Sequence, residues 1–152
     1  MVATMRWAVL ATVVLAVACK GAGSGASSDS SSPAAASAAA APAQPTLGDA
    51  VQPNGTVHTV QLIADAKGTR FDPKDITAKQ GDVVKFVLTL GVHNVHFLPE
   101  KNPAGVNLPK ASDMLQLPGQ SYELLVGARP GTYNFQCDPH AALGMVGTIK
   151  VQ

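Results

Sequence analysis

Four residues in the C-terminal part of the chain carry side chains that bind transition metals. They are His93, Cys137, His140 and Met145, and the last three lie within nine positions of one another. One thiolate, two imidazoles and a weakly bound thioether form the ligand set of a mononuclear blue-copper centre, which is an electron-transfer site. The residue types and their order therefore predict a redox-active copper site.

The spacing of the last three residues predicts how the chain wraps around a metal. Asp138 and Pro139 stand between the cysteine and the histidine, and the proline ring stiffens a turn by fixing one backbone dihedral angle. Gly144 precedes Met145 and gives the backbone freedom at that point. We therefore expect a tight loop at the end of one strand, with His93 supplied by an adjacent strand.

Two of these residues also have an ordinary structural interpretation. A buried cysteine often acts as an inert hydrophobic side chain, and methionine commonly fills space in a core. The spacing of His140 and Met145 after Cys137 favours metal binding over both alternatives. A structural zinc site is disfavoured, since such sites typically use cysteine and histidine alone.

The segment from Tyr133 to Val151 resembles the C-terminal copper loop of the plastocyanin/azurin family of cupredoxins. Its Cys-x-Pro-His-x4-Met spacing is that of plastocyanins, and Gly91–Phe97, with a His followed by Asn, resembles the family's first ligand segment. The resemblance covers about a hundred residues, the size of one ordinary domain. It implies that the four residues named above bind one type 1 copper ion, which alternates between Cu(I) and Cu(II).

The same resemblance assigns roles to residues around the ligands. In the family, hydrogen bonds of the asparagine at position 94 tie the two ligand segments together, and such contacts rigidify a metal site. The alternative for Asn94 is an exposed polar residue of a strand. The second histidine, here His140, lies nearer the surface within an apolar docking patch and is the expected electron exit, although loops commonly expose small apolar side chains. The patch residues would be Pro139, Ala141, Ala142 and Leu143.

The chain differs from the plant-type pattern in two respects. Gln136 stands where those proteins usually have a tyrosine before the ligand cysteine, and their acidic clusters are absent from this sequence. A remote electron route through a tyrosine and docking through an acidic patch are therefore not expected. A photosynthetic role does not follow from the resemblance.

From Val57 onward, short runs of β-forming residues alternate with turn signals such as Pro118-Gly119. Strands at this spacing predict an all-β sandwich or barrel of antiparallel strands. The resemblance implies the more specific Greek-key β-sandwich, the cupredoxin-like fold. Between residues 99 and 117 we expect a long loop, with room for a short helical turn. The expected strands are Val57–Ile63, Asp75–Ala78, Val83–Leu90, Val92–Leu98, Ser121–Val126, Thr132–Cys137 and Val146–Val151.

Alternation along the strands predicts which side chains are buried. His93, Val95 and Phe97 share one face, and its two apolar members indicate that this face packs inward. His96 should point the opposite way, as a surface or packed histidine rather than a ligand. Tyr133 resembles the tyrosine corner of Greek-key sandwiches and is expected to be structural.

The N-terminus has the features of a secretory signal, expected over residues 1–18. Arg6 precedes an apolar run that ends in a small-x-small cleavage pattern, and this run is shorter than the roughly 20 residues that span a bilayer. Cys19 follows at once, which suggests a bacterial lipoprotein, although Ala16 stands where a lipobox usually has leucine. The alternative is ordinary export with a free Cys19. Both place the protein outside the cytoplasm, in the periplasm or held at a membrane.

Residues 19–50 follow as a linker rich in Gly, Ser, Ala and Pro, which is expected to be disordered. The linker would either hold the domain off a membrane or act as a spacer without a length requirement. The plastocyanin-like domain is expected at 51–152. The net charge of the chain is +1, which gives no footprint for nucleic acid and no sign of strong steering toward a charged partner.

The expected function is electron transport by an exported monomer, with redox proteins such as cytochromes or oxidases as partners that dock near His140. No enzymatic activity is expected, since the sequence shows no paired carboxylates, Ser/His/Asp arrangement or phosphate loop. The alternative is copper storage or delivery without rapid redox cycling. That alternative is disfavoured because the four methionines and four histidines form no Met-rich or His-rich tract.

Overall fold

The computed structural model describes residues 44–152. The expected signal sequence, Cys19 and most of the expected linker lie outside the described residues. Within residues 44–152, no helix is long and apolar enough to cross a membrane.

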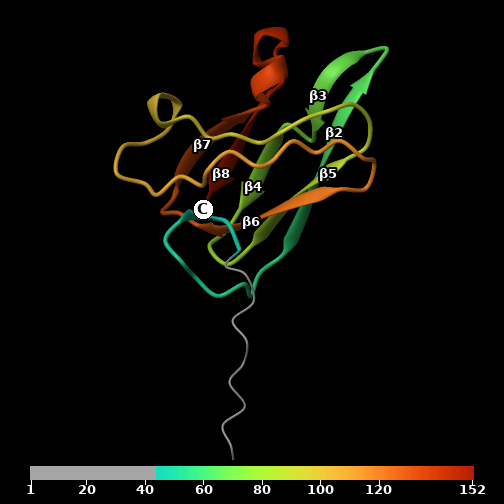
Figure 1. Cartoon of the computed structure of the whole chain (residues 1–152). Helices are drawn as coiled ribbons and strands as arrows, with labels where there is room; N and C mark the ends of the chain where they lie inside the picture. Colours follow the sequence, from blue (N-terminus) through green and yellow to red (C-terminus); the bar gives the residue numbers. More distant parts are fainter. Residues whose placement is uncertain (1–43) are drawn as a thin grey trace, which may run out of the picture. The chain divides into compact units, whose positions relative to one another are not determined.

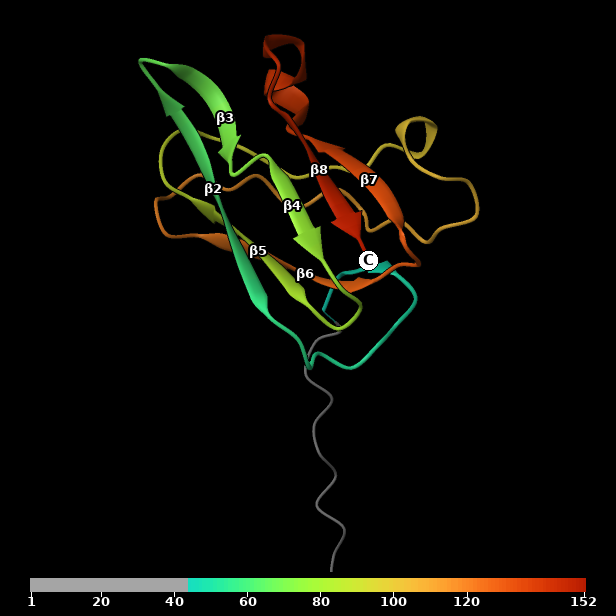
Figure 2. The same cartoon turned by 180° about the vertical axis from the view of Figure 1, so that it is seen from behind.

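The described residues form two β-sheets that pack against each other (Figure 1; Figure 2). The larger sheet has the strand order β1-β6-β5-β2-β3, and the smaller has the order β4-β8-β7. The strands are β1 (Thr46–Gly48), β2 (Val57–Asp65), β3 (Gly68–Asp72), β4 (Asp75–Ala78), β5 (Val83–Leu88), β6 (Ser121–Gly127), β7 (Gly131–Gln136) and β8 (Val146–Val151). The predicted all-β sandwich is therefore confirmed.

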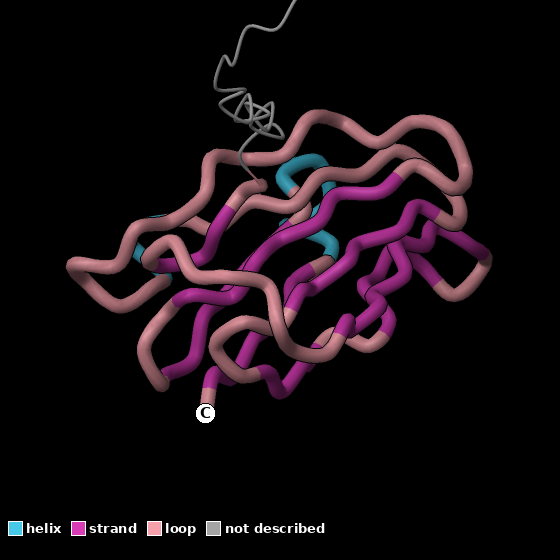
Figure 3. Tube along the Cα trace, turned by 90° about the horizontal axis from the view of Figure 1, so that it is seen from below, coloured by secondary structure: helices cyan, strands magenta, loops and turns pink. Residues whose placement is uncertain are grey.

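The pairing of the strands is mixed rather than purely antiparallel. β1 pairs with β6, β2 with β5 and β4 with β8 in parallel, while the other neighbours are antiparallel. Parallel neighbours need a crossover connection. Here the chain forms one or more strands of the other sheet between the two strands of each parallel pair. The regular structure is almost entirely strand and loop (Figure 3), with short 3-10 helices η1 (Pro99–Lys101) and η2 (Asp138–Leu143).

One expected strand is absent. The segment 92–98 is not a strand, and it makes only two isolated bridges, His93 with Leu115 and His96 with Gln136. The segment pairs first with the loop on one side and then with β7 on the other, so it cannot continue a single ladder. The predicted inward face is nevertheless buried, since His93, like Val95 and Phe97, is almost completely inaccessible.

The domain begins earlier than the expected boundary at residue 51. Thr46–Gly48 forms β1, in which Leu47 is fully buried and lies opposite Val126 of β6. The amide of Leu125 also donates to the carbonyl of Pro45 at 2.9 Å. The end of the segment expected as a disordered linker is therefore part of the folded domain.

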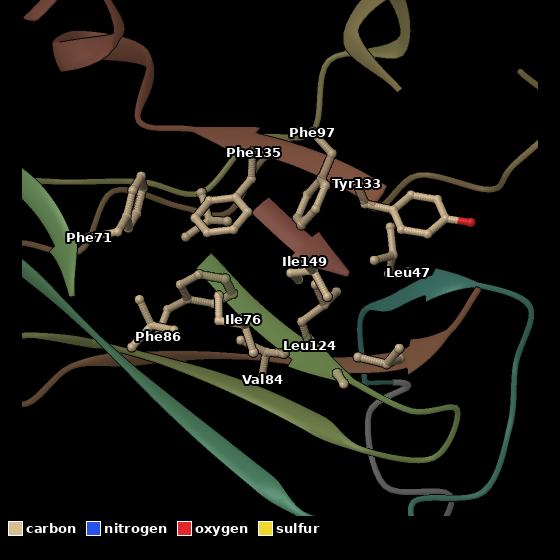
Figure 4. Packing of buried hydrophobic residues seen from close by; sticks show 14 of the residues in the cluster. Leu47, Phe71, Ile76, Val84, Phe86, Phe97, Leu124, Tyr133, Phe135 and Ile149 are labelled. Carbon is tan, nitrogen blue, oxygen red and sulfur yellow. The ribbon is translucent and has the colours of Figure 1, made fainter. Parts of the chain in front are cut away.

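Aromatic rings fill the space between the sheets (Figure 4). The Phe135 ring of β7 is at the centre, with its centroid 4.8 Å from that of Phe71, 5.2 Å from Phe86 and 5.7 Å from Phe97. Tyr133 is fully buried on the same strand, and its hydroxyl donates to the carbonyl of Arg129 at 2.8 Å. The expected tyrosine corner is present, and this packing fixes the strand that leads to Cys137.

A buried carboxylate holds the turn between β4 and β5. Asp82, which is 6% exposed, accepts hydrogen bonds from the backbone amides of Thr56 and Lys79 at 2.8 and 2.9 Å, and its Oδ2 lies 2.8 Å from His58 Nε2. Burial alone would raise the pKa of Asp82, but these hydrogen bonds outweigh it and the pKa is lowered. The ionised carboxylate therefore stabilises the fold.

We expect Asp82→Asn to lower the free energy of unfolding by about 1–3 kcal/mol at neutral pH, because an amide is a weaker acceptor than a carboxylate. A lowered folded-state pKa contributes stability above the ordinary value of 3.8, and this stability is lost as the pH falls through the folded value. Urea unfolding of both proteins at about pH 7 and about pH 2 measures this, with a difference that shrinks in acid. A difference independent of pH would contradict the assignment.

Candidate metal centre

The loop that follows β7 carries three of the four expected ligands. Cys137 caps η2 in an extended conformation, Pro139 lies in the first turn, and Gly144 ends the helix with φ 86° and ψ 14°. This left-handed conformation favours glycine, as the sequence predicts. The tight loop at the end of a strand is confirmed, and Figure 1 shows it projecting beyond the ends of β7 and β8.

The loop closes on itself through its own backbone. The amide of Cys137 donates to the carbonyl of Met145 at 3.1 Å, and the amide of Met145 donates to the carbonyl of His140 at 3.1 Å. Met145, directly before β8, is completely buried. These bonds place the methionine backbone next to both other loop residues, as the wrapping of a metal requires.

Three donor atoms from two segments converge beside this loop. His93 Nδ1 lies 3.2 Å from His140 Nδ1, and Cys137 Sγ lies 3.5 Å and 3.4 Å from the same two nitrogens. The point equidistant from these three atoms is about 2 Å from each, the length of a bond from a transition metal to an imidazole nitrogen. Among the described residues, this is the one group of three His, Cys, Asp or Glu side chains placed to hold a metal.

His93 is fully buried and its ring is oriented by the backbone. Its Nε2 lies 3.1 Å from the carbonyl oxygen of Leu90, which can only accept, so Nε2 carries the proton. Nδ1 is then unprotonated, and its lone pair is available to bind a metal. Burial lowers the pKa of His93, and the nearby His140 lowers it further against the opposing effect of the Leu90 carbonyl. The ring is therefore neutral, as a metal ligand must be.

Cys137 is also fully buried. Burial raises the pKa of its thiol, and the carboxylate of Asp138 acts in the same direction. Only a cation at the centre of the three donors would hold this group as a thiolate at neutral pH. The site is therefore built for a metal rather than for a free reactive thiol.

His140 is the most accessible member of the group. It is half-buried, and its ring centroid lies 4.8 Å from that of His93. Leu143, on the same loop, has 72% of its surface exposed. Leu90 and Val92, which precede His93, are 50% and 45% exposed. Large apolar side chains thus lie exposed on both segments that supply the site.

The match to a protein-family model decides the family. Residues 58–152 match the model described as copper binding proteins of the plastocyanin/azurin family. The chain belongs to this family. Its cofactor is copper. The donor set fits that ion better than structural zinc, because the buried Met145 is joined through its backbone to Cys137 and His140.

Curated and solved relatives agree with this membership. The chain is 42% identical over 97 residues to a chloroplastic plastocyanin of Chlamydomonas reinhardtii, covering 62% of this chain and 66% of that protein. It is 40% identical over 97 residues to the plastocyanin of Scenedesmus fuscus, covering 62% of this chain and 98% of that protein. The oxidized plastocyanin from Dryopteris crassirhizoma superposes with a TM-score of 0.51 at 34% identity, covering 62% of this chain and 99% of that one.

A pseudoazurin from Sinorhizobium is also similar in structure. It superposes with a TM-score of 0.51 at 28% identity and covers 64% of this chain and 75% of that one. The similarity to both plastocyanin and pseudoazurin shows that the two-sheet fold described above is that of cupredoxins.

An asparagine ties the two ligand segments of this cupredoxin together. Asn94 Nδ2 donates to Asp138 Oδ2 at 2.8 Å, and the amide of Asp138 donates to Asn94 Oδ1 at 2.8 Å. The expected role of Asn94 is confirmed, and the alternative of an exposed strand residue is wrong. The pair clamps the residue after Cys137 to the residue after His93.

Asp138 lies in the turn, as the sequence indicates, and its carboxylate also makes several hydrogen bonds. Its carboxylate also accepts from Gln136 Nε2 at 3.0 Å and lies 3.0 Å from His96 Nδ1. Burial would raise the pKa of Asp138, but the bonds from Asn94, Gln136 and His96 outweigh it and lower the pKa. His96 is therefore a packed surface histidine, as expected, and Asp138 is the centre of a polar cluster beside the ligands.

Two further contacts of the site have no clear sequence signal. The Leu90 carbonyl that orients His93 is a backbone group, so the side chain at that position gives no hint of it. Gly91 has φ 101°, and a Cβ there would lie 2.8 Å from His93 Nε2 and 2.7 Å from the Cβ of Ala64. The glycine before the first ligand segment could have suggested such a close approach, but only the folded chain shows what approaches it.

Proposed function

We propose that this chain is a type 1 copper protein that carries single electrons between redox partners outside the cytoplasm. His93, Cys137, His140 and Met145 would hold the ion. The observation that carries the proposal is the convergence of Nδ1, Nδ1 and Sγ to within 3.2–3.5 Å of one another in a buried site. Copper bound there would supply a reversible one-electron couple.

The protein itself holds these donor atoms in fixed positions and excludes water from them. His93 is oriented by the Leu90 carbonyl, and the loop from Cys137 to Met145 is closed by backbone hydrogen bonds. Fixed donors change little when the charge of the bound ion changes, so little reorganisation opposes electron transfer. Burial of His93, Cys137 and Met145 shields the site from water, which tunes its potential.

Electrons would enter and leave through His140. It is the accessible ligand, and the exposed Leu90, Val92 and Leu143 offer apolar contact area on both segments around the site. A patch of this kind suits brief contacts with redox proteins such as cytochromes or oxidases, because apolar surface binds without demanding matched charges. We expect the protein to be a monomer that docks through this patch.

The N-terminal residues would place the carrier where its partners are. We infer export by a signal at 1–18 and lipid attachment at Cys19, followed by a tether that ends where β1 begins at Thr46. Mass spectrometry of the protein from bacterial membranes tests this, because lipidation adds acyl mass to a chain that begins at Cys19. A soluble periplasmic protein with an unmodified Cys19 would support export but contradict the lipid anchor.

The proposal predicts a specific effect of Met145→Leu. The variant should still bind copper, and its reduction potential should rise by roughly tens of millivolts, since loss of the thioether removes a donor that favours the oxidised ion. Protein-film voltammetry measures the shift. Met114→Leu, a matched change at a residue of the irregular 102–117 loop, should leave the potential unchanged. If both variants have the wild-type potential, Met145 is not a ligand.

Electron transfer and copper storage would use the same ligands and differ in rate. Voltammetry of the copper-loaded protein should give one reversible wave that integrates to one electron for each bound ion. The peak separation should remain small as the scan rate increases, because the ligands are already in place. Tight copper binding without a reversible wave would favour storage or delivery instead.

A further inference from the structure

The strand β1 is an addition to the part of the chain that matches the family model. That match begins at residue 58, whereas β1 spans Thr46–Gly48. The strand lies at the edge of the larger sheet, where it pairs in parallel with β6 opposite Leu125–Gly127. Because β6 already begins at Ser121, β1 covers only the last part of its edge.

The uncovered part of β6 has backbone groups that point toward this edge. On the other side of β6, the amide of Val126 donates to the carbonyl of Asp82 beside β5 at 2.9 Å. Since bonding to one neighbour alternates along an antiparallel strand, Ser121 and Glu123 direct their backbone groups away from β5. Within residues 44–152, no group hydrogen-bonds to the backbone of these two residues on the β1 side. Such an edge is a template for a further strand.

The register of β1 predicts which residues would continue along this edge. The amide of Leu125 donates to the carbonyl of Pro45 at 2.9 Å, so the odd-numbered residues of this segment face β6. Two residues earlier on both strands, the carbonyl of Ala43 would lie opposite the amide of Glu123, and the amide of Ala43 opposite the carbonyl of Ser121. Pro45 has no N–H to donate to Glu123, which accounts for the end of regular pairing at this point.

A hollow of about 430 Å3 lies beside the same part of the edge. Tyr122 of β6 and Pro45 line it, together with loop residues 109–113. Because side chains alternate along a strand, the side chain of Ala43 would point to the same face as that of Pro45 and enter the hollow. Residues 33–44 carry no charged side chain, so their alanine and proline side chains suit the proline and tyrosine surfaces of the lining.

We propose that residues 41–44 of this chain continue β1 along the edge of β6, as a strap that covers both the edge and the hollow. A second copy of the chain is a less favourable occupant, because the strap adjoins Pro45, which is already held, and its effective concentration at the edge is high. The strap would also block pairing between copies through this edge. The proposal concerns the edge of the sheet and does not depend on the proposed electron-carrier function.

The strap would fix the point at which the N-terminal tether leaves the domain. β1 runs parallel to β6, so the tether would leave level with Ser121, which lies opposite Val87 near the end of β5. The chain that follows β5 supplies the Leu90 carbonyl that orients His93. The tether would therefore leave from the copper-bearing end of the domain, and a lipid at Cys19 would hold the domain by that end.

Amide hydrogen exchange, followed by nuclear magnetic resonance, tests the strap. The sample is the 15N-labelled chain from residue 19 onward with Cys19→Ser, recorded with and without Cu(I). The Glu123 amide should exchange within about tenfold of the rate of Leu125, because both would donate to the same strand. Exchange of Glu123 at the rate of an unprotected amide would overturn the proposal. Protection that is lost on dilution would mean pairing with a second copy and would overturn it as well.

Two proline variants separate strand pairing from a general effect on the segment. Ala43→Pro removes the N–H that would face the Ser121 carbonyl and should speed the exchange of Glu123 at least about tenfold. In Gln44→Pro the lost N–H would face away from β6, so exchange should change less than about twofold. Equal effects of both variants, or no effect of either, would refute the strap. Retained protection of the core strands shows in each sample that the domain is folded, and the comparison without copper keeps a failure to bind the ion separate.

Discussion

Copper-loaded Cys137→Ser should lack the intense blue absorption expected of the wild-type protein. That absorption arises from charge transfer between a thiolate and Cu(II), and Cys137 Sγ lies within 3.5 Å of both imidazole nitrogens. A serine hydroxyl cannot be deprotonated to the same extent and is a harder donor, so the colour should be lost completely. Visible spectra of both proteins after addition of one equivalent of Cu(II) measure the effect.

Cys19→Ser is the matched control for this prediction. It makes the same chemical change at the other cysteine of the chain, so its spectrum should equal that of the wild type. Circular dichroism should show that both variants keep the β-sheet fold, because serine is close to cysteine in volume. A blue band that survives in Cys137→Ser would show that the thiolate is not part of the copper site.

Phe135→Ala should cause the largest loss of stability in the domain. The ring packs edge-on against Phe71 and Phe86 and also contacts Phe97, so its removal leaves a cavity at the centre of the core. Large-to-small changes of this kind cost about 3–5 kcal/mol. Chemical denaturation of the metal-free proteins measures the loss without a contribution from copper binding.

Phe135→Leu keeps most of the buried volume and should cost clearly less than the alanine variant. The same position joins the core to the site, since Phe135 lies on β7, which ends one residue before Cys137. We therefore expect Phe135→Ala also to broaden the visible band of the loaded protein. A cost below about 1 kcal/mol for Phe135→Ala would mean that the aromatic cluster does not hold the two sheets together.

The sequence predicted the part of the site in which ligand chemistry and chain geometry agree. Cysteine, histidine and methionine at short spacing imply one loop, and proline and glycine indicate its two turns, as η2 and the left-handed Gly144 confirm. The convergence of His93 with Cys137 and His140 is also confirmed. Coordination of copper by these residues stays a prediction.

Other features depend on contacts that have no local signature. β3 is short and contains glycine, arginine and aspartate, so only its pairing with β2 makes it a strand. β1 lies at the end of a low-complexity stretch and is stabilised by β6, about eighty residues away. The segment 92–98 has the alternation of a strand, but it changes partners midway and remains irregular.

The side-chain contacts of the polar cluster around Asp138 also have no signature in the local sequence. The sequence shows that Asn94 and Asp138 are next to ligands. It does not show the hydrogen bonds that join Asp138 to Asn94, Gln136 and His96. Such a cluster forms only when the 92–98 segment crosses over the end of β7. The substitution of tyrosine by Gln136 was visible in the sequence, whereas its contact with Lys101 was not.

A titration of the wild-type protein with Cu(II), followed by visible absorption, tests the central claim most directly. The geometry of the three donors predicts an intense blue band that saturates at one equivalent of copper and is bleached by ascorbate. The band should return on reoxidation, because the donors stay in place in both states. A pale solution at saturation would mean that no copper–thiolate bond forms at Cys137, and it would contradict the assignment of a type 1 site.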